Sequence, residues 1–187
     1  MTPLITSIAD EFRRYKAGGE GALAQVAEPL LSEPGPGNGN SLAVICWHMA
    51  GNFQSRFSDF LTTDGEKPDR DRESEFAARS ITRGELMAKW DLGWNTMLSA
   101  IDALTDNDLF RTVAIRQQPL SVHEALLRSL AHASYHVGQI VYVAHYFCGP
   151  EWKYLTIPPG QSAAYNLAPT FEKPTAHADH VKSVSRG

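Results

Sequence analysis

The chain has 187 residues, of which 43% are hydrophobic, 20% charged and 10% aromatic. A chain of this length and composition buries a full core as one domain, which excludes a disordered or fibrous protein. The formal net charge is −4 at pH 7 and no run of Lys or Arg is present, so nucleic acid and anionic membrane surfaces are excluded as expected partners.

The start of the chain and its cysteines indicate the compartment. The first residues lack the basic start and apolar block of a secretory signal, and no stretch approaches the ~18 apolar residues of a transmembrane helix. Cys46 and Cys148 each lie in an apolar segment, where free buried thiols are expected in a reducing compartment. We therefore expect a cytoplasmic protein.

The first half of the chain predicts two helices. Apolar positions recur at helical spacing over residues 3–31, with an interruption at the glycine pair 18–19. Residues 32–40 are rich in Pro and Gly and predict a loop. Ser41 is expected to cap a second helix that continues to about Leu61 with a continuous apolar stripe.

A charged connection, Thr62–Ser80, follows and is expected to be solvated chain. About twenty extended residues reach up to ~66 Å, roughly twice the ~30 Å length of a twenty-residue helix. The next helix can therefore run parallel to the second. The capping-box pair Thr82 and Glu85 predicts its start, and Thr105 lies near its end.

Residues 109–117 have β-branched, alternating character and predict a short extended arm, with a hairpin as one option. A second capping box, Ser121 with Glu124, begins a fourth helix that is expected to reach about Phe147. This helix is apolar nearly all round, which is typical of burial on more than one side or of contact with a partner subunit.

The end of the chain predicts no further long helix. Residues 151–166 contain Pro-Pro-Gly and buried-type aromatic residues, so they are expected to be non-helical and to pack across the helices. Residues 167–187 are polar and predict a weakly ordered tail. The sequence thus predicts an all-α domain over residues 1–166, a tail over 167–187, and a long connection between the second and third helices.

His132 and His136 lie four residues apart on the fourth helix, so both imidazoles can point at one spot. This is metal-ligand spacing. The alternative is a pair of core histidines that are hydrogen-bonded within the protein.

A third ligand must come from another element. His123 and His145 face the opposite side of the fourth helix, and His177 and His180 lie in the polar tail, which favours exposure to solvent. His48 remains, on the apolar second helix. Alone it would be interpreted as a core or boundary histidine, but it is the partner that completes the set His48, His132 and His136.

Three neutral imidazoles leave coordination positions open for water or substrate, as in a catalytic metal site. Ligand type does not choose among first-row metals. Three further residues are candidate outer-shell or substrate contacts: Gln139, Tyr135 and Asn52. A surface glutamine and a core tyrosine are the alternative interpretations of the first two.

The sequence resembles the DinB/YfiT-like superfamily of metalloenzymes, and within it the DUF1572 branch, over about residues 5–166. The resemblance rests on four motifs in this order: I-C-W-H-M-A-G-N-F, D-G-E-K-P-D-R-D-R-E-S-E-F, H-A-S-Y-H-V-G-Q-I-V-Y and W-K-Y-L-T-I-P-P-G-Q-S.

The resemblance implies a four-helix bundle of up-down-down-up topology and a homodimer. It also implies a divalent metal, zinc or nickel with iron or manganese as alternatives, held by His48, His132 and His136. Characterised relatives include thiol-dependent isomerases and S-transferases, which implies a low-molecular-weight thiol co-substrate.

Three functions remain open. In the first, the protein is a metal-dependent enzyme in which the metal lowers the pKa of a thiol or a substrate oxygen for transfer to, or isomerisation of, a small electrophile. In the second, it is a metal-stabilised dimeric helical bundle that binds a ligand without catalysis. In the third, no metal binds and the histidines are hydrogen-bonded in the core.

Overall fold

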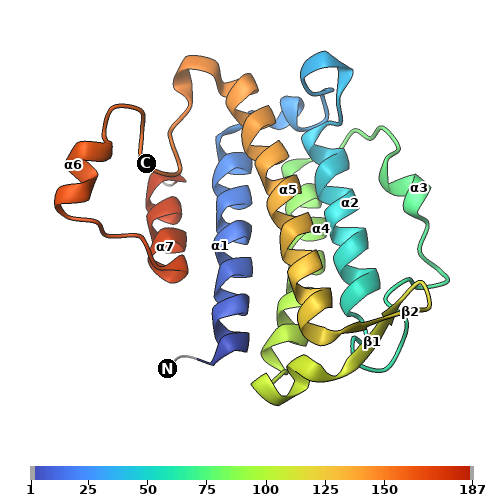
Figure 1. Ribbon diagram of the computed structural model, residues 1–187. Coiled ribbons are helices and arrows are strands. Elements are labelled where there is room, and N and C mark those ends of the chain that lie inside the picture. The colour runs from blue at the N-terminus through green and yellow to red at the C-terminus, as the bar shows by residue number, and fades with distance from the viewer. Residues whose placement is uncertain (1–2, 186–187) are drawn as a thin grey trace.

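The computed structural model describes residues 3–185, and these residues are mainly helical with one small hairpin (Figure 1). The strands are β1 (Thr112–Ile115) and β2 (Gln118–Ser121), and short 3-10 helices cover Glu28–Leu31, Pro36–Asn38, Asp106–Phe110 and Gly149–Glu151. The helices are α1 (Leu4–Gln25), α2 (Leu42–Phe57), α3 (Arg72–Glu75), α4 (Arg83–Asp102), α5 (Val122–Cys148), α6 (Ser162–Leu167) and α7 (Pro174–Ser185).

The four long helices α1, α2, α4 and α5 lie side by side around one core (Figure 1). Helices α1 and α5 run in one direction, and α2 and α4 run in the other. The largest fully buried side chains include Trp90 and Trp94 of α4 and Phe53 of α2. Helices α2 and α4 approach closely, because a Cβ at Gly93 would collide with Ala50.

The predicted helix starts are confirmed. The Ser41 hydroxyl accepts the backbone N–H of Val44 at 3.2 Å and caps α2. Thr82 and Glu85 form a reciprocal capping box at α4, as do Ser121 and Glu124 at α5. These caps satisfy backbone donors that helical hydrogen bonds leave free, so they fix where each helix begins.

The predicted interruption of the first helix and the predicted end of the second were wrong. Helix α1 continues through the glycine pair 18–19. The indole of Trp90 packs against Gly19 in the space that a Cβ would occupy. A side chain there would clash, so tertiary packing accounts for a residue with low helix propensity. Helix α2 ends at Phe57 rather than near Leu61, and a turn follows it.

The hairpin option of the sequence is confirmed, with Thr112 opposite Ser121 in antiparallel register. Its turn residues Arg116 and Gln117 both have positive φ, at 55° and 62°. The Asp64 carboxylate accepts both of their backbone N–H groups, at 2.8 and 2.7 Å. These two bonds offset the cost of the left-handed backbone and attach the hairpin to the connection after α2.

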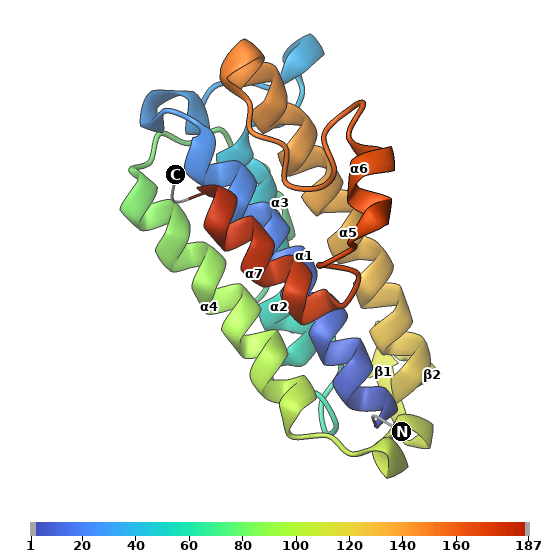
Figure 2. The same cartoon turned by 90° about the vertical axis from the view of Figure 1, so that its left-hand side faces the viewer.

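The prediction that residues 151–166 are non-helical holds for 152–161 and was wrong beyond them, because helix α6 begins at Ser162. In the predicted tail, α7 packs along α1 (Figure 2), with Ala178 and Val181 buried. Ala178 and Val181 are three residues apart, so they lie on one side of α7 and are both buried against α1. The domain boundary at 166 stays a prediction, and residues 1–2 and 186–187 of the predicted domain and tail lie outside the described residues.

Within residues 3–185, no helix combines the length and the apolar character that crossing a membrane requires.

Candidate metal centre

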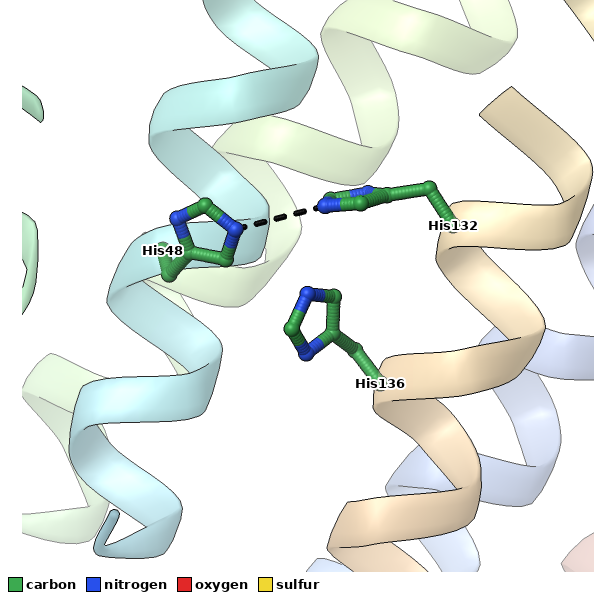
Figure 3. A group of neighbouring side chains, drawn as sticks. All are labelled: His48, His132 and His136. Carbon is green, nitrogen blue, oxygen red and sulfur yellow. Dashed lines mark hydrogen bonds between the residues drawn. The ribbon is translucent and has the colours of Figure 1, made fainter. Parts of the chain in front are cut away.

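The three predicted ligands come together between α2 and α5 (Figure 3). His132 and His136 lie one turn apart on α5, and His48 faces them from α2. One ring nitrogen from each histidine lies within 4.8 Å of the other two. The group could therefore hold one metal ion. The spacing of His132 and His136 on one helix was by itself also compatible with two core histidines.

Packing on either side of the histidines fixes their directions. Ala133, Val137 and Ile140 turn into the core of the molecule from α5, which leaves His132 and His136 half-buried at the edge. His48 is only 6% exposed. The cluster thus has a buried side at α2 and a side at α5 that solvent reaches.

A carboxylate holds the buried histidine. His48 Nδ1 lies 2.9 Å from Glu75 Oε2, and because an ionised carboxylate only accepts, Nδ1 donates its hydrogen. Glu75 is 5% exposed and also accepts two hydrogen bonds from Arg70, from Nε at 2.8 Å and from Nη2 at 2.9 Å. His48 Nε2 is left with its lone pair toward His132 and His136, as a metal ligand requires.

His136 is oriented in the same way. Its Nδ1 donates to Gln139 Oε1 at 2.7 Å, which leaves Nε2 free. The third ring, His132, has its Nε2 3.2 Å from His48 Nε2, while its buried Nδ1 has no hydrogen-bond partner among the described residues.

The local electrostatics keep His132 and His136 unprotonated. Burial, together with His136 and His48, lowers the pKa of His132 to about 3, and burial lowers the pKa of His136. Burial alone would raise the pKa of Glu75, but hydrogen bonds from His48 and Arg70 lower it overall. Neutral imidazoles beside an ionised carboxylate are the states in which these groups bind or support a cation.

The spacing fits a metal ion. Two tetrahedral ligands at the usual zinc–nitrogen distance of about 2.0–2.1 Å stand about 3.3 Å apart. The separation between His48 Nε2 and His132 Nε2 is 3.2 Å. If no ion binds, His132 Nε2 donates its hydrogen to His48 Nε2, because the hydrogen of His48 lies on Nδ1; with or without an ion, His132 Nδ1 has no hydrogen-bond partner among the described residues.

The three candidate outer-shell residues differ in their contacts. Gln139 contacts His136 through the hydrogen bond above. Tyr135 is 64% exposed, and its ring lies 5.0 Å from the His136 ring between centroids. Asn52 is half-buried, and across residues 3–185 it makes no hydrogen bond to the three histidines. Their roles stay predictions.

The four remaining histidines lie outside the cluster. His123 Nδ1 lies 3.1 Å from the carbonyl oxygen of Leu109, and His145 stacks on Trp152. His177 and His180 belong to α7. His177 is buried rather than exposed, so the prediction that the tail places it in solvent was wrong.

Glu75 and its surroundings were not predicted from the sequence. The connection 62–80, which was expected to be solvated, packs against α2 at Glu75, where a Cβ at Gly51 would collide with the carboxylate. Phe76 covers His48, with ring centroids 4.6 Å apart. Phe76 is the apolar residue that stands out in a charged stretch, and it was the available signal that this stretch is anchored.

A family model described as "Protein of unknown function (DUF1572)" matches residues 1–161. Comparison with curated proteins and comparison with solved structures each found no match.

Proposed function

The chain belongs to the DUF1572 family, whose description assigns no function, so we propose a function from its own residues: His48, His132 and His136 bind one divalent metal ion in a metal-dependent enzyme. The observation that carries the proposal is that three ring nitrogens, contributed by two helices, lie within 4.8 Å of one another. The hydrogen bonds from His48 to Glu75 and from His136 to Gln139 support it, because metal-binding histidines typically donate their second N–H in this way.

The ligand set favours catalysis over a purely structural role. Structural zinc sites usually have four protein ligands, whereas this group has three among the described residues. Glu75, the nearest carboxylate, is already engaged by His48 and Arg70. His132 and His136 are half-buried, so the group is open to solvent on the α5 side.

The chemistry that we propose is the addition of a thiol to a small electrophile, or the thiol-dependent isomerisation of that electrophile. A divalent ion held by three imidazoles supplies Lewis-acid chemistry that lowers the pKa of a thiol or water. The protein's own contribution is to orient the ligands: Glu75 keeps the hydrogen on His48 Nδ1, and Gln139 does the same for His136. Zinc and nickel are our first candidates, with iron and manganese as alternatives.

We further propose that α1, α2, α4 and α5 form a four-helix bundle of the DinB/YfiT-like kind. The opposite directions of the pairs α1/α5 and α2/α4 support this (Figure 1).

A homodimer through α5 is also proposed. Its outer face carries four large apolar residues that are each more than half exposed, and such a stripe is typical of a protein interface. These residues are Leu127, Tyr135, Tyr142 and Tyr146.

Elemental analysis tests the metal site. We expect about one metal ion per chain in the wild type and in the His123→Ala variant, and about a tenth of that in His48→Ala and His132→Ala. His123 is the matched control because it lies on the same helix outside the cluster. Loading the wild type with Co²⁺ gives a second readout that needs no variant: visible absorption bands report nitrogen ligation. Equal metal content in all four proteins would remove the proposed site.

Turnover separates the enzyme from a metal-stabilised binding protein. The metal-loaded protein is assayed for thiol consumption against a panel of reduced thiols and electrophiles, and thermal stability is measured beside it. An enzyme loses turnover in His132→Ala more than it loses stability. A binding protein loses stability and has no turnover to lose.

A further inference from the structure

A second cavity lies on another face of α5, away from the metal centre. It has a volume of about 340 Å³ and is enclosed by α1, α5, the segment 152–156 and α7. Its α5 positions, including Val137, Gly138 and Val141, lie on a different side of the helix from His132 and His136. Cavities of about 300–1,000 Å³ are typical of small-molecule sites.

The outer wall of this cavity is held in place by specific contacts. The side chain of Gln25, at the end of α1, makes two hydrogen bonds with the backbone of Lys153: its Oε1 accepts the N–H at 2.7 Å, and its Nε2 donates to the carbonyl at 3.1 Å. His145 of α5 stacks on Trp152, with ring centroids 5.1 Å apart and planes 22° apart. The cavity is therefore largely preformed, which lowers the entropic cost of binding a ligand.

The cavity lining is aromatic and basic. Tyr15 and Trp152 are among its apolar walls, and the lining also includes one guanidinium group, Arg14, and two imidazoles, His145 and His177. No carboxylate lines it among the described residues, although the chain carries a net charge of −4. Arg14 Nη1 also lies 3.5 Å from Glu11 Oε2, which is outside the lining, so an anion in the cavity would share the guanidinium group with this partly exposed carboxylate. An aromatic wall with a guanidinium group matches an aromatic ring that carries a negative charge.

His177 adds an unsatisfied polar group to this wall. It is 6% exposed, and within residues 3–185 neither ring nitrogen has a hydrogen-bond partner. Burial lowers its pKa, with Arg14 as a second cause, so the ring is neutral and offers one donor and one acceptor. A buried imidazole without partners is costly, but both ring nitrogens are inaccessible to solvent, so His177 contributes to the wall and is not assigned a contact with the ligand.

Gly138 lies at the exposed mouth of the cavity. A Cβ added at this position would meet no atom within 4 Å. The glycine lies inside α5, where any other non-proline residue would be better for the helix. The glycine at position 138 therefore leaves space for a ligand and does not stabilise α5.

We propose that this cavity binds a small aromatic anion, with its ring against Trp152 and Tyr15 and its charge on Arg14. The site is separate from the metal centre, and its occupation does not depend on the proposed reaction.

Two dyes with the same ring system test the proposal on the full-length protein. The first, 8-anilinonaphthalene-1-sulfonate, is an aromatic anion, and the second, N-phenyl-1-naphthylamine, lacks the sulfonate. Fluorescence titration of the wild type is expected to show one saturable site for the anion. Gly138→Leu fills the mouth of the cavity and is expected to weaken binding of both dyes about tenfold or more. The matched control is Gly84→Leu in α4, an exposed helical glycine outside the cavity, which leaves binding unchanged.

Arg14→Gln separates charge recognition from simple apolar binding. The variant is expected to weaken binding of the sulfonate about tenfold and of the neutral dye less than twofold. Circular dichroism melts establish that each variant is folded.

Three results would overturn the proposal. In the first, the wild type has no saturable site, or Gly138→Leu binds as well as the wild type. In the second, Arg14→Gln changes both dyes equally or neither of them. In the third, the wild type is a dimer that Gly138→Leu converts to a monomer, in which case this face is an interface between two copies.

Discussion

At the scale of single residues, Glu75 connects the charged segment before α4 to the histidine cluster. It accepts hydrogen bonds from His48 and from Arg70 while it is 5% exposed. The bond to His48 sets which ring nitrogen carries the hydrogen, and the bonds to Arg70 balance the buried charge. Glu75 therefore orients His48, a proposed metal ligand, and is not itself one of the three proposed ligands.

Replacing Glu75 by Gln is expected to weaken metal binding about 10- to 100-fold, because the amide no longer fixes the His48 tautomer. Competition with a chromophoric chelator measures this dissociation constant. Glu73→Gln is the matched control, since that side chain lies on the same short helix with 88% exposure. Equal affinity in the wild type and Glu75→Gln would show that the carboxylate does not support the site.

The two cysteines differ in burial, and their reactivity follows from it. Cys46 is fully buried on α2, and burial raises the pKa of its thiol. Cys148 is half-buried, and its Sγ donates to the carbonyl oxygen of Gln25 at 3.3 Å. Since the thiolate is the reactive form, Cys148 should react first.

With Ellman's reagent at pH 8, we expect one thiol to react in the native protein and two in guanidinium chloride. Cys46 should react at least about 100-fold faster once the chain is unfolded. Cys148→Ser should remove the native reaction, and Cys46→Ser should leave it intact. A native reaction that persists in Cys148→Ser would contradict the packing of α2.

At the scale of elements, side-chain caps fix the ends of the helices and of the turn before β1. The 3-10 helix at Asp106–Phe110 is capped at its start by Asp108, whose carboxylate accepts hydrogen bonds from the Thr105 backbone N–H at 2.9 Å and from the Thr105 hydroxyl at 2.8 Å. These bonds, with a third from Arg111, lower the pKa of Asp108 to about 2. The turn that leads into the hairpin and α5 therefore depends on a charged carboxylate.

This lowered pKa gives a pH dependence with a definite sign. The stabilisation by Asp108 is present above the ordinary pKa of 3.8 and is lost as the pH falls toward about 2, where the folded carboxylate binds a proton. Asp108→Asn should therefore lower the thermal midpoint at pH 7, and the difference from the wild type should shrink between pH 4 and pH 2. Asp179→Asn, at an 80% exposed side chain of α7, serves as the control. A gap that stays constant over this range would contradict the assignment.

At the scale of the whole molecule, α7 adds a further helix to the four long ones. It lies along α1, and Val181 is 1% exposed (Figure 2). Fully burying a valine side chain contributes about 1.5–3 kcal/mol, and Ala178 adds a smaller amount. The end of the chain thus stabilises the helix that also carries Arg14 and Tyr15 of the second cavity.

A chain ending at residue 166 should fold but lose about 3 kcal/mol of unfolding free energy, because the surface of α1 under α7 becomes exposed. Urea denaturation measures the loss and tests the predicted domain boundary at the same time. Val181→Asp in the full-length chain should act in the same direction, whereas Ser183→Asp on the exposed side of α7 should have little effect. A truncated chain as stable as the full one would confirm residues 167–187 as a tail outside the domain.

The sequence by itself determined the features that depend on local geometry. The caps at Ser41, Thr82 and Ser121 and the helical apolar stripes follow from hydrogen bonds and periodicities within a few residues. The spacing of His132 and His136 on one helix is of the same kind. His48 was predicted as their partner because His123 and His145 face elsewhere and His177 and His180 lie in the polar tail, although the second argument failed for His177, which is buried.

Only the tertiary structure decided the features that depend on distant segments meeting. Glu75 lies in the connection that composition assigned to solvent, yet it contacts His48, which is 27 positions earlier in the chain. Helix α7 becomes ordered against α1 although its own apolar stripe is short. Gly19 stays helical because Trp90 fills the space beside it. In each case the free energy comes from a surface supplied by another element, which no local pattern encodes.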